Sequence, residues 1–285
     1  MAPDADRRPR ASSPLRPHSR ALALLLLIAL PSALRAAPAT DASAFFGKDT
    51  TSEAALMGIF YDLKQTPQRT ATGVDVSSYV TVLDDFVSKG LSEEVMNQYY
   101  RTSKPVYTTQ IYIPMMSANE APKAFGVAKI VKPSRWIIHY KGQVSPPEDG
   151  AYRFLGYADD VIFVAVNGQL VLNGSRDSFN KLLKKTKWNP TDKLRDYRVG
   201  NGNLIAGDWL NLTAAQPVDI DIIIGEHPGG DFCAFLYYQK QGAAYPAVNG
   251  KQALPLFQVA PYAGVLPANG GGPAIVNQAF WKCYQ

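Results

Sequence analysis

Cysteine and histidine are scarce in this chain of 285 residues, which contains two Cys and three His. Beyond the first 39 residues only His139 and His227 remain, and the sequence has neither a CxxC pair nor an HExxH motif. These absences argue against a structural or catalytic zinc site. The two cysteines, Cys233 and Cys283, leave two interpretations open: one disulfide, or a free thiol at Cys233 buried in its apolar segment.

The chain also lacks the common catalytic fingerprints. It has no GxSxG motif and no P-loop, and the Gly200-Asn201-Gly202 run has no third glycine of a dinucleotide-binding turn. We therefore expect a protein that is not an enzyme. Nor is there a surplus of charge: the net charge is +5, but six Arg and two Asp lie within residues 1–39, leaving 23 basic and 22 acidic residues. This balance gives no electrostatic case for nucleic acid as a partner.

Long hydrophobic runs are limited to one stretch of ten apolar residues, 21–30, which is too short to span a bilayer. A basic segment with five arginines precedes it, and the small residues Ala37-Pro38-Ala39 follow it. This pattern predicts a signal peptide over residues 1–39, with cleavage after Ala39 or, alternatively, after Ala36. We therefore expect an exported protein, secreted, periplasmic or on the cell surface, without a transmembrane span in the mature chain.

The rest of the chain divides into a lead-in (40–55), a domain (56–241) and a tail rich in Gly, Pro and Ala (242–285). Apolar residues at three- and four-residue spacing predict a helix at 76–89 and a second at 93–100, a helical insertion over about residues 75–100. Elsewhere the pattern is that of strands separated by turns without intervening helices. The expected strands are residues 106–115, 135–141, 150–157, 161–166, 170–172, 209–213, 218–224 and 232–239. The fold class that follows is mainly β, an antiparallel β-sandwich.

Residues 136–174 carry a specific motif: an aromatic-started strand, Pro-Pro-x-Asp-Gly-x-Tyr-x-Phe, an Asp-Asp pair, an apolar strand and Asn-Gly. The positions are Trp136, Gly142, Pro146, Pro147, Asp149, Gly150, Tyr152, Phe154, Ala158, Asp159, Asp160, Asn167 and Gly168. This motif resembles the core of the anthrax-protective-antigen-type (PA14) domain, a β-sandwich module of secreted proteins. Weaker likeness at residues 56–61 and 219–238 extends the resemblance over most of the mature chain.

The resemblance implies a site at Asp159 and Asp160. In sugar-binding members of the family such a pair is joined by a cis peptide and chelates calcium, which then holds sugar hydroxyls. The second ligand loop corresponds to residues 226–231, where Glu226 and Asp231 are further candidates. Sugar-binding members have an Asn near the position of Glu226, so this chain departs from their pattern. The alternative is that Asp159 accepts backbone N–H bonds and caps the strand turn.

We therefore expect an exported, non-catalytic module that binds a carbohydrate, either a glycan or a surface polysaccharide, with calcium as the candidate cofactor. The alternative is a structural or protein-interaction domain of a cell-envelope or surface assembly, with envelope proteins as partners. The basic run at 181–187 is interpreted as a solvated face, and Trp136 and Trp209 as core residues because both lie in expected strands.

Overall fold

The computed structural model describes residues 41–50, 54–190, 192–261, 275–276 and 279–284. The predicted signal peptide lies outside these residues. None of the helices in the described part of the chain combines the length and the apolar character needed to span a bilayer.

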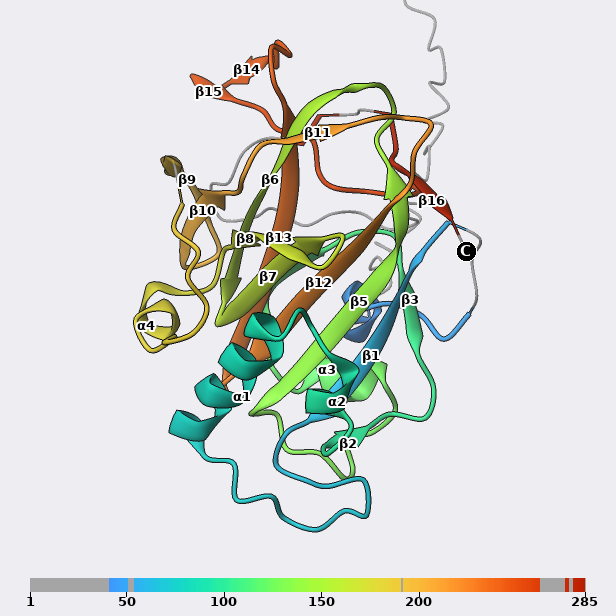
Figure 1. The fold of residues 1–285 in the computed structure, drawn as a ribbon, viewed down its shortest axis with the longest axis vertical. Coiled ribbons are helices and arrows are strands. Elements are labelled where there is room, and N and C mark those ends of the chain that lie inside the picture. The colour runs from blue at the N-terminus through green and yellow to red at the C-terminus, as the bar shows by residue number, and fades with distance from the viewer. Residues whose placement is uncertain (1–40, 51–53, 191, 262–274, 277–278, 285) are drawn as a thin grey trace, which may run out of the picture. The chain divides into compact units, whose positions relative to one another are not determined.

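Two antiparallel sheets face each other (Figure 1), which confirms the predicted β-sandwich. The first sheet has the order β2-β1-β5-β12-β7-β8, with β3 paired to β1 and β16 paired to β5. Its strands are β1 (Leu56–Asp62), β2 (Tyr100–Arg101), β3 (Val106–Thr108), β5 (Trp136–Ser145), β7 (Val161–Val166), β8 (Gln169–Asn173), β12 (Val218–Glu226) and β16 (Lys282–Tyr284).

The second sheet has the order β4-β13-β6-β10-β9, with β11 paired to β6. Its strands are β4 (Tyr112–Ser117), β6 (Gly150–Asp159), β9 (Asp192–Val199), β10 (Gly202–Ala206), β11 (Leu210–Leu212) and β13 (Asp231–Lys240). The expected strand at 106–115 is therefore divided between the two sheets as β3 and β4. Strand β9 was not expected, because its sequence is dominated by charged residues.

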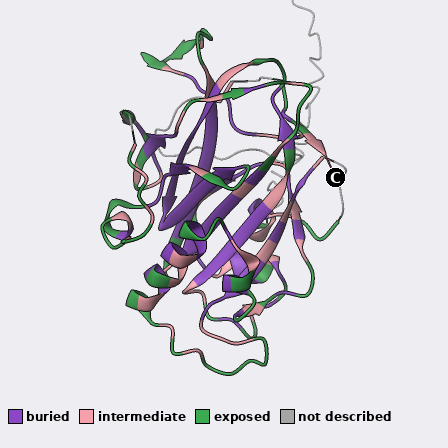
Figure 2. Ribbon diagram, in the orientation of Figure 1, coloured by how far each residue is buried: buried purple, intermediate pink, exposed green. Residues whose placement is uncertain are grey.

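The main core lies between the sheets and follows the alternation of side chains along each strand. Trp136, Ile138 and Tyr140 of β5 point inward and are fully buried, together with Phe154 of β6 and Ile222 of β12. Figure 2 shows this burial along the central strands of both sheets.

The outer face of the first sheet has its own apolar cluster, because helices cover part of it. Helix α1 (Val76–Ser88) begins at Asp75, whose carboxylate accepts the backbone N–H of Ser78 in a capping box. Its buried residues Tyr79, Leu83 and Phe86 pack with Ile137 and Ile223 of the sheet. The short helix α2 (Glu93–Met96) follows, so the second expected helix is present but ends four residues before residue 100, which lies in β2.

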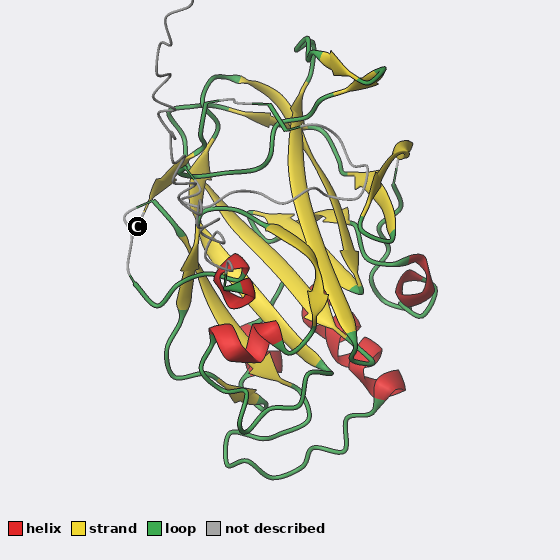
Figure 3. Ribbon diagram, turned by 180° about the vertical axis from the view of Figure 1, so that it is seen from behind, coloured by secondary structure: helices red, strands yellow, loops and turns green. Residues whose placement is uncertain are grey.

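Three further helical turns are short: η1 (Ala42–Phe45), α3 (Glu120–Ala124) and α4 (Asp177–Asn180). Figure 3 shows that α1, α2 and α3 lie in the half of the sandwich away from the hairpin of β14 (Ala247–Val248) and β15 (Lys251–Gln252).

The C-terminal region, expected to be a tail rich in Gly, Pro and Ala, contributes side chains to the core. Among its described residues, Leu254, Phe257 and Trp281 are almost completely buried. Trp281 lies 5.3 Å from Tyr152 and 5.5 Å from Phe154 between ring centroids, so it fills the main core. Strand β16 then extends the first sheet. A few large apolar side chains therefore anchor this region to the core despite its Gly- and Pro-rich composition.

Two other expectations are resolved by the structure. Trp136 is buried as predicted, but the prediction for Trp209 is wrong, since it is 40% exposed. Trp209 lies just before the short strand β11, and the guanidinium of Arg153 stacks 4.6 Å from its ring centroid. Cys233 and Cys283 are both free thiols, so the disulfide alternative does not hold in this structure.

Candidate functional site

Asp159 and Asp160 lie where the chain crosses from one sheet to the other. Asp159 is the last residue of β6 in the second sheet, and Asp160 directly precedes β7 in the first sheet. The peptide bond between them is cis. Both residues are buried, with exposed fractions of 6% and 5%. The crossing therefore holds two adjacent acidic side chains away from bulk water.

Asp159 has a partner on each carboxylate oxygen. Its Oδ1 accepts a hydrogen bond of 2.8 Å from Nη1 of Arg176, and its Oδ2 accepts one from the side-chain amide of Asn201. The hydroxyl of Tyr157 donates to Oδ1 of Asn201 at 2.6 Å, which orients the amide. Side chains, and not the backbone N–H groups considered as the alternative, therefore make these contacts.

Asp160 has fewer donors. Its Oδ2 accepts the backbone N–H of His227 at 3.1 Å, and its Oδ1 lies 3.9 Å from Nη1 of Arg176. The backbone carbonyl of Asp160 accepts the N–H of Arg176 at 2.8 Å, which fixes the start of the arginine side chain beside the pair. Burial, the hydrogen bond with Asp159 and the charge of Asp159 raise the pKa of Asp160 to about 7.

Glu226 adds a third buried carboxyl group from the end of β12, and its exposed fraction is 1%. Its Oε1 accepts the backbone N–H of Gly229 at 2.8 Å, whereas its Oε2 is buried without a hydrogen-bond partner. Burial and the charge of Asp160 raise the pKa of Glu226 to about 9. The structure thus brings Glu226 into electrostatic contact with the aspartate pair.

Asp231 occupies a different environment. It is exposed at the start of β13, where it pairs with Ser117 of β4. The hydrogen bonds and ion pairs of the described residues do not join it to the aspartate pair. Its role as a ligand remains a prediction.

A cavity of about 370 Å³ adjoins the pair. Arg176 and Asn201, which both bind Asp159, line this cavity, and so do Tyr157, Asp177 and Asn203. Sequence analysis did not identify Arg176 or Asn201, because they lie 17 and 42 residues from Asp159 in the chain. The cavity offers an arginine, two amides and a tyrosine next to buried carboxyl groups.

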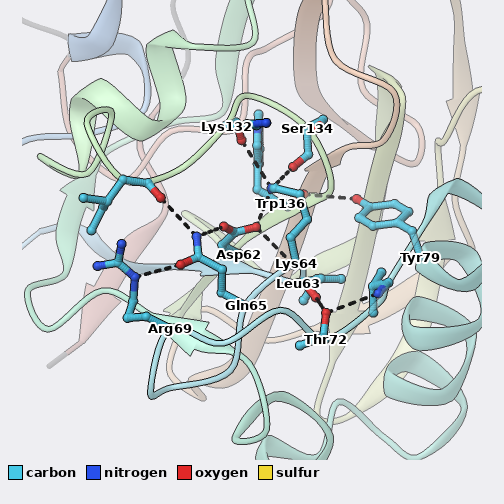
Figure 4. Close-up of polar contacts among 12 residues, drawn as sticks. Asp62, Leu63, Lys64, Gln65, Arg69, Thr72, Tyr79, Lys132, Ser134 and Trp136 are labelled. Carbon is cyan, nitrogen blue, oxygen red and sulfur yellow. Dashed lines mark hydrogen bonds and ion pairs between the residues drawn. The ribbon is translucent and has the colours of Figure 1, made fainter.

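The buried carboxylate of Asp62, in contrast, accepts hydrogen bonds on both of its oxygens (Figure 4). Its Oδ1 accepts the backbone N–H of Lys64 at 3.2 Å and the ammonium of Lys64, and its Oδ2 accepts the amide of Gln65 at 2.6 Å. The same lysine also donates to the carbonyl of Ser134. Asp62 has a cation and amide donors, so it holds the loop after β1 in place.

The donor atoms at the aspartate pair are of the type that binds calcium. Calcium prefers six to eight oxygen ligands, and the two aspartates together with the unpartnered Oε2 of Glu226 supply the appropriate donor type. The guanidinium of Arg176, however, already contacts Asp159. Within the described residues, no three His, Cys, Asp or Glu side chains are arranged as a ready metal site. The donors suit calcium only if Arg176 moves aside.

The fold and the site define a two-sheet antiparallel sandwich with an acidic pair at a sheet crossing. Residues 127–245 match the model of the PA14 domain family. A comparison with curated proteins finds no match.

Solved structures with a similar fold include the PA14 sugar-binding domain from an RTX adhesin, with 17% identity over 68% of this chain and 94% of that one, at a TM-score of 0.41. The PA14 domain of the antifreeze protein MpAFP has 16% identity over 69% of this chain and 89% of that one, at 0.38. The A domain of epithelial adhesin 6 from Candida glabrata, solved in complex with Galb1-3GlcNAc, has 15% identity over 81% and 95%, at 0.37.

Proposed function

We propose that this protein is an exported, non-catalytic module that binds a carbohydrate in the cavity beside Asp159 and Asp160. The observation that supports this proposal most directly is the cluster of three buried carboxyl groups, Asp159, Asp160 and Glu226, of which the half-exposed cation Arg176 contacts the two aspartates. Buried carboxylates without sufficient partners are unstable unless they are protonated or bound by a ligand. A ligand rich in hydroxyl groups satisfies such a cluster, because hydroxyls both donate and accept hydrogen bonds.

The cavity residues can orient a sugar. Arg176 and Asn201 present donors fixed by their bonds to Asp159, and Asp177 and Asn203 add acceptors on the same wall. Polar side chains of this kind, placed around a small cavity, confer specificity for the positions of hydroxyl groups.

Calcium is the second part of the proposal. Asp159 and Asp160 would hold the ion, with Glu226 helping from the end of β12 and Asp231 as a lower-ranked candidate. When bound, calcium supplies direct coordination of sugar hydroxyls. The side chain of Arg176 is 49% exposed, so it has solvent to move into when the ion arrives.

The experiment is a calorimetric titration of the protein with calcium, beside the double variant Asp159→Ala, Asp160→Ala. We expect saturable binding that the double variant loses. The exposed acid Glu94 lies on α2, so Glu94→Gln serves as the matched control and should bind like the native protein. Glycan screening with and without a chelator then tests the sugar itself.

A second candidate function is favoured by the protein's own contacts with Asp159 and Asp160. Arg176, Asn201 and the backbone of His227 all cover the aspartates, as expected for a structural or protein-interaction domain of a surface assembly. That function predicts neither calcium binding nor glycan retention. Absence of both in the titration and the screen would therefore replace the carbohydrate proposal with this one.

A further inference from the structure

Among the residues that the structure describes, helices cover the outer face of the first sheet along only part of its length. Helix α1 packs on Ile137, Ile223 and Phe163, and its Phe86 contacts His139 edge-on at 5.6 Å. Beyond His139 the strands β5 and β12 continue past the helices, as Figure 1 shows. This uncovered half is made up of β3, β16, the start of β1 and the far ends of β5 and β12.

The strand register places a defined set of side chains on that uncovered face. In one row, Met57 of β1 lies between Tyr107 of β3 and Lys141 of β5, and Lys141 pairs in turn with Asp221 of β12. In the next row, Gln143 of β5 lies between Tyr284 of β16 and Asp219 of β12. Directly opposed residues of antiparallel strands share one face of the sheet. On this face, the two tyrosines therefore lie at the β3 and β16 edge, and the two aspartates lie across β5 on β12.

These rows line a hollow of about 700 Å³. From β3 to β12 the hollow spans three strand intervals, or about 14 Å, which is long enough for a short oligosaccharide. Such a volume lies within the range of ligand sites in proteins. The hollow is remote in sequence and register from Asp159 and Asp160, whose strands meet the sheet at the end of β12 that the helices cover.

The polar groups of the hollow select against acidic ligands. Lys141 is paired with Glu93 of α2, so its charge is balanced within the protein. Nε2 of His139 donates to Oδ1 of Asp221 at 2.7 Å, and the side-chain amide of Gln143 donates to Oδ1 of Asp219 at 2.9 Å. The remaining balance is acidic, which repels uronic or sulfated polymers and nucleic acid. A neutral ligand with many hydroxyls meets no such repulsion and can donate to the carboxylates.

The tyrosines supply the apolar part of recognition. The ring of Tyr284 is held by its hydroxyl, 3.1 Å from Oγ of Ser145, and by the ammonium of Lys282, 4.6 Å from the ring centroid. Fixed aromatic rings stack on the apolar C–H faces of pyranose rings, and those faces are widest in β-linked sugars with equatorial substituents. From this arrangement we propose a second binding site, on the uncovered face of the first sheet, for a neutral β-linked oligosaccharide. It is independent of the site at Asp159.

The test is a titration of the protein with cellohexaose and with chitin hexasaccharide, both in the presence of EDTA, and with an acidic oligogalacturonide as the negative probe. We expect one of the neutral probes to bind and the acidic probe not to bind. The variants Tyr284→Leu and Asp219→Asn should each weaken binding about tenfold, the scale of one aromatic or charged contact. Tyr284→Phe keeps the ring and should retain affinity within about threefold.

The variant Asp159→Asn, Asp160→Asn separates this site from the proposed carbohydrate site, because it should leave binding in EDTA unchanged. Failure of both neutral probes to bind in EDTA overturns the inference while leaving calcium-assisted binding at the aspartate pair intact. Binding that the aspartate-pair variant abolishes, and that Tyr284→Leu and Asp219→Asn leave untouched, overturns it as well. Melting curves show which variants are folded. Asp219 is exposed, so Asp219→Asn still tests the site if Tyr284→Leu fails to fold.

Discussion

Two buried carboxyl groups of this protein, Asp84 and Asp160, have similar burial and opposite electrostatics. Asp84 on α1 is 4% exposed and accepts three backbone N–H groups from the loop after α4, those of Lys184, Lys185 and Thr186, at 2.6 to 2.7 Å. Burial acts to raise the pKa of Asp84, but these hydrogen bonds outweigh it and the pKa is lowered. Asp160 is 5% exposed, and its pKa is raised to about 7. The supply of hydrogen-bond donors, and not the depth of burial, therefore determines whether the pKa of a buried acid is lowered or raised.

The largest effect is expected at the structural acid. Asp84→Ala leaves three backbone N–H groups without their acceptor, so we expect the free energy of unfolding to fall by about 2 to 4 kcal/mol. The neighbouring Asp85→Asn removes only a surface contact with the ammonium of Lys185 and should cost less than about 1 kcal/mol. Urea unfolding of both variants measures the difference. Equal losses would contradict the structural role of Asp84.

The pH dependence of stability should have opposite signs at the two sites. In the unfolded chain carboxyl groups lose their protons near pH 4, whereas folded Asp160 and Glu226 hold theirs to about 7 and about 9. Between pH 4 and the folded pKa of each group, the folded state binds more protons than the unfolded chain. The free energy of unfolding therefore falls as pH rises, by up to about 1.4 kcal/mol per pH unit for each group. Asp84, with a lowered pKa, contributes stability above pH 4 that is lost as pH falls further.

Melting temperatures between pH 5 and pH 9 in EDTA check this prediction. Glu226→Gln removes one of the two titrating groups and should flatten the decline. A native profile that rises over this range would show that the cluster is already satisfied. Calcium, which favours the deprotonated carboxylates, should stabilise the protein more at pH 8 than at pH 6.

Most of the fold followed from local sequence patterns. The apolar spacing and the Asp75 cap of α1, the alternation along β6, and the Asn167-Gly168 hairpin are each determined by residues within a few positions of one another. The pair Asp159-Asp160 was identified through the resemblance of its motif to the PA14 domain.

The contacts that decide the character of each acid could not be predicted in this way. The N–H donors of Asp84 lie 100 residues or more along the chain, so helical spacing alone could not identify it as a buried acid. Arg176 reaches Asp159 only because β8 returns the chain beside β7. Each depends on tertiary pairing, which sequence spacing does not record.

Arg176 itself gives the next prediction. Its guanidinium lies on Asp159 and close to Asp160, so under the proposed function it would compete with calcium for the pair. Replacing it by glutamine removes the competing charge, and we expect calcium to bind about tenfold more tightly to Arg176→Gln. Arg198, which lies on β9 away from these contacts, provides the control Arg198→Gln. Unchanged calcium affinity in Arg176→Gln would show that the guanidinium is not in the path of the ion.

The smallest effect is expected within the loop of residues 226–231, where two acids differ as sharply as Asp84 and Asp160. Glu226 is 1% exposed with an unpartnered oxygen, so Glu226→Gln should weaken calcium binding about tenfold. Asp231 is exposed to water and high dielectric, and Asp231→Asn should change the affinity by only about twofold. Calorimetry in parallel on the two variants measures the ratio. If Asp231→Asn proved the more damaging, the ion would lie on the β13 side of the loop, and the orphaned oxygen of Glu226 would belong to the packing of β12 instead.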